Sequence, residues 1–203
     1  MKRYFSIALA ALAIAACQQP VQPDMAPGKV QVEPVITRAT EVNFENGDQI
    51  GFTMTKVNGT EAYADNAVLS FDGSVFSGEL MWYADAYSEA DVYAYYPYNA
   101  NGTPTAYFVV EDQTDGIAKA DLMAAVKKGV LPTPNAITMV FKHLMTKLVI
   151  NIDNQSGAEV TGVEIGGCRL VTGLDISEMA LTKYTDIVIE AEPLIKAYEA
   201  TAG

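Results

Sequence analysis

Short alternations of apolar and polar residues, separated by turn-forming residues, run through most of this chain. Turn clusters such as Asn46-Gly47-Asp48 and Asp72-Gly73 recur roughly every ten residues. The runs between them are typical of strands, because successive side chains of a strand point to opposite faces of a sheet. Many short strands at this spacing predict a mainly β protein, a sandwich or a barrel. The predicted strands are residues 49–55, 91–96, 106–110, 137–141, 147–152 and 160–165.

The alternation is clearest at residues 147–152. There Leu148, Ile150 and Ile152 share one side of the expected strand. Antiparallel sheets often have one buried and one solvated face, and this pattern suits such a sheet. Towards the end of the chain, residues 186–191 predict a further strand and residues 192–200 a weak helix.

One internal segment has a different pattern. Residues 117–128 are rich in helix-forming residues, and Leu122, Met123 and Val126 recur at helical spacing. Local propensity therefore predicts a helix of about three turns. A strand is the open alternative, because tertiary context often overrides a short window.

The start of the chain has the features of an export signal. Lys2 and Arg3 precede an apolar stretch over residues 7–16, which ends in two alanines before Cys17. A basic start, an apolar stretch of about ten residues and small residues before the cut indicate a secretory signal. A cysteine directly after the cut indicates the lipoprotein type, with Cys17 lipidated and N-acylated. The alternative is a plain secretory signal in which Cys17 has no special role.

The residues after Cys17 predict a tether followed by one strand. Residues 18–28 contain three prolines and little that could pack, as expected of a linker. Val30 and Val32 then lie on one face of a short strand that Pro34 breaks or confines to a sheet edge. Arg38 follows at a junction between this strand and the β-rich region.

Composition limits the functions that the chain can have. The 203-residue chain has a net charge of −12, and loss of Lys2 and Arg3 with the signal makes it −14. Nucleic acids and anionic lipids bind clustered cations, so this balance argues against both as partners. His143 is the single histidine, and Cys168 has no disulfide partner if Cys17 carries lipid. We therefore expect no metal site, no other cofactor and no enzymatic activity.

A cluster of aromatic residues leaves two interpretations open. Flat rings with polar tips can stack on sugars, so these residues are candidates for glycan binding. The alternative is that they are core and sheet-edge aromatics of a β-domain. The candidates are Trp82, Tyr83, Tyr95, Tyr96 and Tyr98.

An ordered series of motifs resembles the fimbrillin family of Bacteroidetes. The series is Asn46-Gly-Asp-Gln-Ile-Gly-Phe, Trp82, Asp91-Val-Tyr-Ala-Tyr-Tyr-Pro-Tyr, Asp112-Gln, Asp121-Leu-Met-Ala-Ala and Phe141-Lys-His-Leu-Met-Thr-Lys-Leu-Val-Ile-Asn-Ile. The resemblance runs from about Arg38 to about Gly167. It implies transthyretin-like antiparallel β-sandwich domains and a place in a type V pilus as a shaft, tip or anchoring subunit with a role in adhesion.

The resemblance also implies a maturation pathway. Family members are outer-membrane lipoproteins from which a protease removes the lipidated prosegment, after an arginine. For this chain, the cut would follow Arg38, and the strand with Val30 and Val32 would leave. A strand from the next subunit would fill the groove, so the implied partners are other pilus subunits. The surface bound by the pilus would be a host or bacterial glycan or protein.

These expectations give a domain layout. Residues 1–16 form the signal, 17–38 the lipidated prosegment and 39–173 a fimbrillin-like N-terminal sandwich. Residues 174–203 are expected to be a remnant of a second domain, because family members usually continue through a complete second sandwich.

Overall fold

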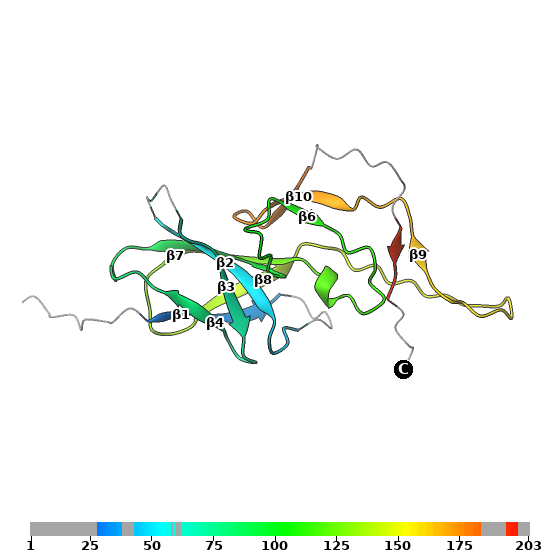
Figure 1. Cartoon of the computed structure of the whole chain (residues 1–203), viewed down its shortest axis with the longest axis horizontal. Helices are drawn as coiled ribbons and strands as arrows, with labels where there is room; N and C mark the ends of the chain where they lie inside the picture. The colour runs from blue at the N-terminus through cyan, green and yellow to red at the C-terminus, as the bar shows by residue number, and fades with distance from the viewer. Residues whose placement is uncertain (1–27, 38–42, 58, 60–61, 184–193, 199–203) are drawn as a thin grey trace, which may run out of the picture.

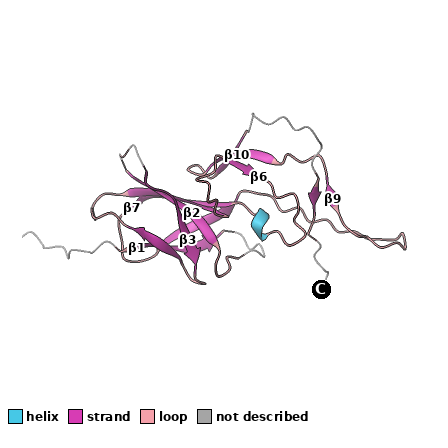
Figure 2. Ribbon diagram, viewed as in Figure 1, coloured by secondary structure: helices cyan, strands magenta, loops and turns pink. Residues whose placement is uncertain are grey.

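The regular secondary structure of the described residues is β-strand apart from one short 3₁₀ turn, as Figures 1 and 2 show. The computed structural model describes residues 28–37, 43–57, 59, 62–183 and 194–198. The mainly β prediction is confirmed. The strands are β1 (Lys29–Ile36), β2 (Gln49–Lys56), β3 (Ala62–Phe71), β4 (Phe76–Met81), β5 (Ala90–Tyr96), β6 (Ala106–Phe108), β7 (Met123–Val130), β8 (Ile137–His143), β9 (Glu164–Ile165), β10 (Val171–Asp175), β11 (Ala180–Thr182) and β12 (Ile195–Lys196).

Seven strands close into a barrel in the order β1-β4-β3-β2-β5-β7-β8. Aliphatic and aromatic side chains fill its interior, as expected for a small barrel. Phe44 lies at the centre of an aromatic group, with its ring centroid 4.9 Å from that of Phe76 and 5.2 Å from that of Phe141. The largest fully buried side chains of this interior also include Phe52, Ile50 and Met54.

The barrel differs from the expected two-sheet antiparallel sandwich in one respect. Strand β1 lies between β4 and β8, so the sheet is continuous around the barrel. β1 is antiparallel to β4 and parallel to β8. A strand from the N-terminus thus joins two edges that would otherwise remain separate.

Of the two conformations left open for residues 117–128, the helix is wrong and the strand forms from Met123 onward. Only Ala118–Ala120 is helical, as a single 3₁₀ turn, and β7 begins at Met123. β7 pairs with β5 along most of its length and with β8 at its start. Helix propensities differ by at most about 0.7 kcal/mol per residue for ordinary side chains. A helix here would leave hydrogen-bonding groups of two neighbouring strands unpaired, so tertiary context decides the conformation.

The strand predicted at residues 147–152 is also absent. These residues have no strand pairing within the described part of the chain, and their aliphatic side chains are exposed. Of the strand predicted at residues 160–165, only Glu164–Ile165 forms, as β9. β9 pairs with β12 at Ile195–Lys196, a segment predicted as weak helix. The strand predicted at residues 186–191 lies outside the described residues.

A smaller second unit packs beside the barrel. It contains the three-stranded sheet β11-β10-β6 and the pair β12-β9. Leu174 and Ile176 from this unit form a small core with Tyr95 and Leu122. The predicted domain boundary after residue 173 falls inside β10, whose partner β6 comes from the other side of that boundary. Among the described residues, no helix is long and apolar enough to span a membrane.

Candidate functional site

β1 and the two strands beside it form the candidate site. β1 is the first of the described strands, and it closes the barrel. The six other strands form an uninterrupted series from β4 to β8 without it. Removal of β1 alone would therefore leave every other strand pairing in place and create two edges, β4 and β8. A sheet edge has unpaired backbone donors and acceptors and readily pairs with another strand.

Alternate side chains of β1 are buried in the barrel. Val30 and Val32 are 0% exposed, and Ile36 packs against the same core. On the opposite face, Lys29 and Glu33 are exposed, and Val35 is 42% exposed. Burial of a valine side chain contributes roughly 1.5–3 kcal/mol, so the two valines hold β1 more firmly than its exposed groups do.

The two neighbours of β1 hold different parts of it. β4 pairs with the first half, up to Val32 opposite Phe76. β8 pairs with the second half, from Val32 to Ile36. Pro34 lies in this second half, where β1 has a strand partner on one side only. A proline has no N–H to donate and is tolerated there. The predicted break or edge position is wrong, because β1 continues to Ile36 and lies between β4 and β8.

Few polar contacts hold β1 at its edges. Lys29 Nζ lies 3.0 Å from Glu79 Oε1, with the two side chains 51% and 96% exposed. Thr138 Oγ1 donates to Glu33 Oε2 at 3.2 Å. Exposed pairs of this kind contribute about 0–1 kcal/mol. These two polar contacts therefore add little to the free energy that holds β1 in the barrel.

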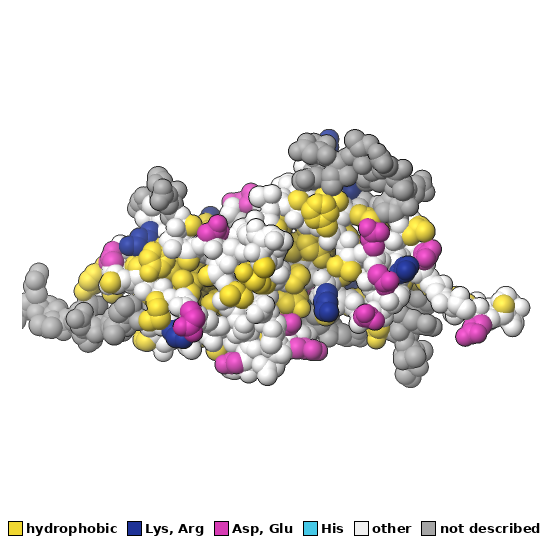
Figure 3. All heavy atoms as spheres, in the orientation of Figure 1, with side chains coloured by type: hydrophobic (Ala, Val, Ile, Leu, Met, Phe, Trp, Pro, Cys, Tyr) yellow, Lys and Arg dark blue, Asp and Glu magenta, His cyan; other side chains and the backbone are white. Residues whose placement is uncertain are grey.

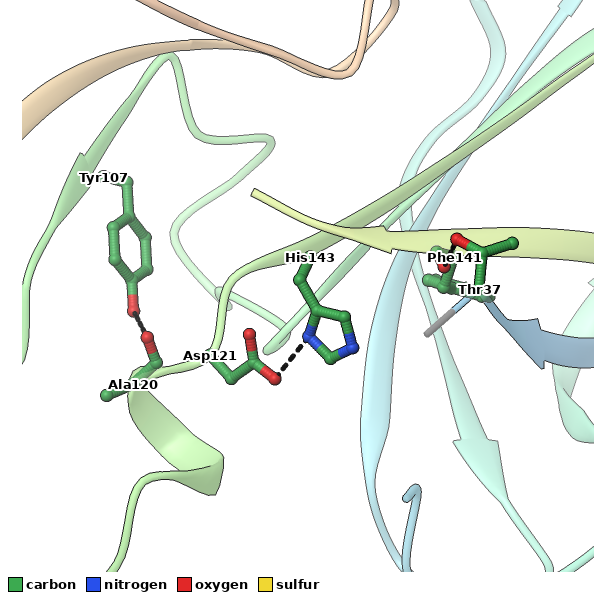
Figure 4. A network of polar contacts seen from close by, with 6 residues as sticks. All are labelled: Thr37, Tyr107, Ala120, Asp121, Phe141 and His143. Carbon is green, nitrogen blue, oxygen red and sulfur yellow. Dashed lines mark hydrogen bonds and ion pairs between the residues drawn. The ribbon is translucent and has the colours of Figure 1, made fainter. Parts of the chain in front are cut away.

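The end of β1 is tied to the end of β8. The backbone N–H and the hydroxyl of Thr37 both donate to the Phe141 carbonyl, at 3.2 and 3.3 Å (Figure 4). Thr37 directly precedes Arg38, the predicted cleavage residue. Arg38 and the predicted lipidation residue Cys17 lie outside the described residues, so both remain predictions.

The single histidine contacts a carboxylate near this site. His143, the last residue of β8, places Nδ1 2.7 Å from Asp121 Oδ2, and their side chains are only 12% and 14% exposed (Figure 4). Close by, the Tyr107 hydroxyl donates to the Ala120 carbonyl at 3.1 Å. Burial, with a smaller effect of Asp121, raises the pKa of Tyr107 to about 12. These contacts join the barrel to the second unit. In the described part of the chain, no group of three or more His, Cys, Asp or Glu could hold a metal ion.

Four of the five candidate glycan-binding aromatics lie in the protein core. Trp82, Tyr83, Tyr95 and Tyr96 are 2–5% exposed, and Tyr98 is half-buried. A ring this deeply buried has no free face for a sugar, so their placement favours the core interpretation.

Hydrogen bonds and electrostatics of the buried tyrosines fit that structural role. The hydroxyls of Tyr83, Tyr95 and Tyr96 donate to Ser88 O, Asn66 Oδ1 and Asp48 Oδ1 respectively. Burial is the main reason why the pKa of each of the three is raised.

Sequence reasoning identified β1 and β8 but missed β4, the other neighbour of β1. β4 was not predicted, and β8 was predicted without its parallel partner. No local signal in residues 137–143 indicates which strand will pair with them. Cys168, the free cysteine among the described residues, is half-buried.

Comparison with known proteins gives a family and structural neighbours, one of which is described below. Residues 37–200 match the family model described as fimbrillin-like. No significantly similar sequence was found among curated proteins. A crystal structure of a fimbrial protein from Bacteroides ovatus ATCC 8483 is 16% identical, with a TM-score of 0.49. That alignment covers 86% of this chain and 46% of the other, so this chain spans less than half the length of that protein.

Proposed function

This chain belongs to the fimbrillin-like family, and on that premise we propose that it is a cell-surface pilus subunit, structural or anchoring, with a role in adhesion. In this proposal, Cys17 carries lipid and holds the precursor at the outer membrane. Proteolysis after Arg38 then removes the prosegment together with β1. Strand complementation by another pilus subunit completes the barrel, and no cofactor is required.

The position of β1 is the observation that carries the proposal. β1 precedes the other described strands and lies at the seam of the sheet, so one cut after it would release it without disturbing any other strand pairing. The family match begins at residue 37, directly after β1 ends. A vacated groove would have an apolar floor at the positions of Val30 and Val32 and two unpaired edges. An incoming strand would bury apolar side chains on this floor and pair its backbone with both edges, which is β-augmentation.

Repetition of this contact would build a filament. The groove of one subunit and the donated strand of the next are different surfaces, so the contact is head-to-tail. A head-to-tail contact that does not close into a ring continues as a fibre. A glycan-binding lipoprotein is the other functional hypothesis, but four of its five proposed residues are buried.

The cleavage step has a sharp test, because Arg38 and Arg169 are the only arginines after the signal segment. Both wild-type protein and the Arg169→Gln variant should release a form beginning at Ala39 when treated with an arginine-specific protease. The Arg38→Gln variant should retain its prosegment. Arg169 is exposed, so it is the matched control for the loss of an arginine. Shed protein whose N-terminus lies elsewhere would contradict this assignment.

The lipid anchor has a separate test. Labelled palmitate should be incorporated into wild-type protein in cells and not into Cys17→Ala. Cys168→Ala, which removes the other cysteine, should still be labelled. Equal labelling of Cys17→Ala and wild type would exclude Cys17 as the lipidated residue.

A further inference from the structure

Large apolar side chains are exposed together at one end of the barrel. Their exposed fractions run from 39% for Val57 to 72% for Tyr87, and the set, which we call the apolar end, is Val57, Tyr63, Met81, Tyr87 and Leu131. Figure 1 shows this end of the barrel at the left, away from the second unit, and Figure 3 shows apolar side chains on the surface there. Exposed apolar residues that occur singly are ordinary, whereas a group of them in one region marks an interaction surface.

Backbone contacts hold the connections at the apolar end together. The Val57 N–H, directly after β2, donates to the Glu89 carbonyl at 2.8 Å, directly before β5. The Gly129 N–H, near the end of β7, donates to Asp91 Oδ1 at 3.0 Å. These bonds join the connections that follow β2, β4 and β7, so the exposed side chains of the apolar end belong to one surface.

The most exposed member, Tyr87, lies in a loop whose shape is fixed by Asp85. Asp85 Oδ1 accepts hydrogen bonds from the backbone N–H groups of Tyr87 and Ser88, at 3.0 and 3.3 Å. Ser88 in turn accepts a hydrogen bond at its carbonyl from the Tyr83 hydroxyl. The Tyr63 ring packs edge-on against that of Tyr83, with the ring centroids 5.3 Å apart. The backbone of Tyr87 and the ring of Tyr63 are therefore held in place, which lowers the entropy lost on binding.

Lysines lie among the carboxylates at the apolar end, although the whole chain has a net charge of −12. Lys29 Nζ is 3.0 Å from Glu79 Oε1. Hydrogen bonds to its carboxylate, and to a lesser degree the charge of Lys56, lower the pKa of Asp85. Glu89 is a further exposed acid there. Anionic lipid surfaces attract clusters of cations, so this mixture of charges suits a surface without net charge.

The chain enters the barrel at this same end. β1 begins at Lys29, and the Trp82 N–H donates to the Gly28 carbonyl at 3.0 Å. Only residues 18–27 separate Gly28 from Cys17. The ends of a flexible chain of this length lie about 16–20 Å apart on average. A lipid on Cys17 would therefore hold the apolar end close to the surface of the bilayer.

We propose that the apolar end rests on the surface of the bilayer while Cys17 anchors the precursor, with zwitterionic lipid as its partner. The inference rests on the proposed function, because it needs the lipid on Cys17. Tyr63 and Tyr87 would lie at the level of the headgroups, where amphipathic aromatic rings are enriched. The other three side chains would reach the boundary with the acyl chains. The anchor makes this contact intramolecular, so a small surface is enough. The second unit would then point away from the membrane.

Tryptophan substitutions measure this contact directly. Acylated Tyr87→Trp protein is purified from cells and placed in phosphatidylcholine vesicles whose acyl chains carry bromine, which quenches nearby tryptophan. After subtraction of the wild-type signal of Trp82, about half or more of the added fluorescence should be lost. Phe108→Trp is the matched control, because Phe108 is 61% exposed but belongs to β6 in the second unit. It should lose less than about a tenth of its fluorescence.

A second set of variants tests whether the tyrosines make the contact. In a Cys168→Ser background, Ala84→Cys carries a polarity-sensitive fluorophore in the exposed loop next to Tyr87. Its emission should shift to shorter wavelength in phosphatidylcholine vesicles, and Tyr63→Ser/Tyr87→Ser should abolish the shift. Phe108→Ser should leave the shift unchanged. Urea unfolding of the variants shows that they are folded, and a shift that survives Tyr63→Ser/Tyr87→Ser would overturn the inference.

Palmitate labelling separates this inference from the proposed function. If Cys17 is acylated and Tyr87→Trp is quenched no more than Phe108→Trp, the inference is wrong and the proposed anchor stands. If Cys17 is not acylated, the anchor and the inference are both wrong. A second copy of the chain is the other possible occupant of the apolar end. Dimers in detergent that Tyr63→Ser/Tyr87→Ser abolishes, without quenching of Tyr87→Trp in vesicles, would assign the surface to that copy and refute the membrane contact.

Discussion

The substitution Val32→Ala tests how firmly β1 is held in the barrel. Val32 is 0% exposed and is the residue at which β1 pairs with both Phe76 of β4 and Ile137 of β8. The change removes two buried carbon atoms, worth about 1.6 kcal/mol of transfer free energy, and leaves a cavity in a packed interior. We therefore expect the free energy of unfolding to fall by about 2–3 kcal/mol. Val35→Ala is the matched control, because the Val35 side chain is 42% exposed on the same strand. It should cost less than about 1 kcal/mol.

Urea denaturation of the uncleaved protein measures this difference. The midpoint for Val32→Ala should fall by about 1–2 M at an unchanged slope, given typical slopes of about 1–3 kcal/mol/M. After cleavage at Arg38, only non-covalent contacts hold β1. A loss of 2–3 kcal/mol should then weaken its retention by about thirty- to a hundred-and-fiftyfold. Equal midpoint shifts for Val32→Ala and Val35→Ala would refute the reasoning, because they would mean that β1 does not bury this face.

Three further predictions concern the rest of the fold. Asp121→Ala leaves the buried His143 ring without its carboxylate partner and should lower the free energy of unfolding by about 1–3 kcal/mol in urea, whereas the exposed control Asp115→Ala should have little effect. The pKa of Tyr107 is raised to about 12 in the folded protein, so the folded state retains a proton that the unfolded state loses above about pH 10. The free energy of unfolding should therefore fall between about pH 10 and 12, and Tyr107→Phe should flatten this fall. Urea unfolding at each pH, together with tyrosinate absorbance, measures both effects. Gly51→Ala would place a Cβ 2.2 Å from Tyr95 Cε1 and should lower the free energy of unfolding by about 1–3 kcal/mol or more, measured by thermal unfolding. Gly162→Ala, with open space around the new Cβ, should be nearly neutral. Equal effects of the two changes would contradict the packing around Tyr95.

Part of the candidate site can be predicted from the sequence. Alternation at Val30 and Val32 predicts a strand with one buried face, which agrees with the structure. Pro34 predicts a broken strand or a sheet edge, and this is wrong because β1 continues to Ile36 and lies between β4 and β8. The motif series predicted the family, which the match over residues 37–200 confirms.

Other predictions failed where local pattern and tertiary pairing disagree. Residues 123–130 have good helix formers, but they lie between β5 and β8 and form a strand. Residues 147–152 have the clearest strand alternation, yet they find no strand partner in the described part of the chain. Periodicity describes which side chains share a face, and it does not say whether another strand is present to pair with that face.

By itself, the sequence determined the mainly β character and the short strand before Arg38, and it predicted the export features around Cys17. Each depends on residues that are neighbours in the chain. Only the tertiary structure decided that this strand closes a barrel, between β4 on one side and a parallel β8 on the other. That arrangement depends on contacts between residues up to about a hundred positions apart, such as Thr138 with Glu33, whose separation is 105 residues. Such contacts form because the chain must bury one apolar face and pair its backbone groups at once, and no local pattern records which distant strand meets both needs.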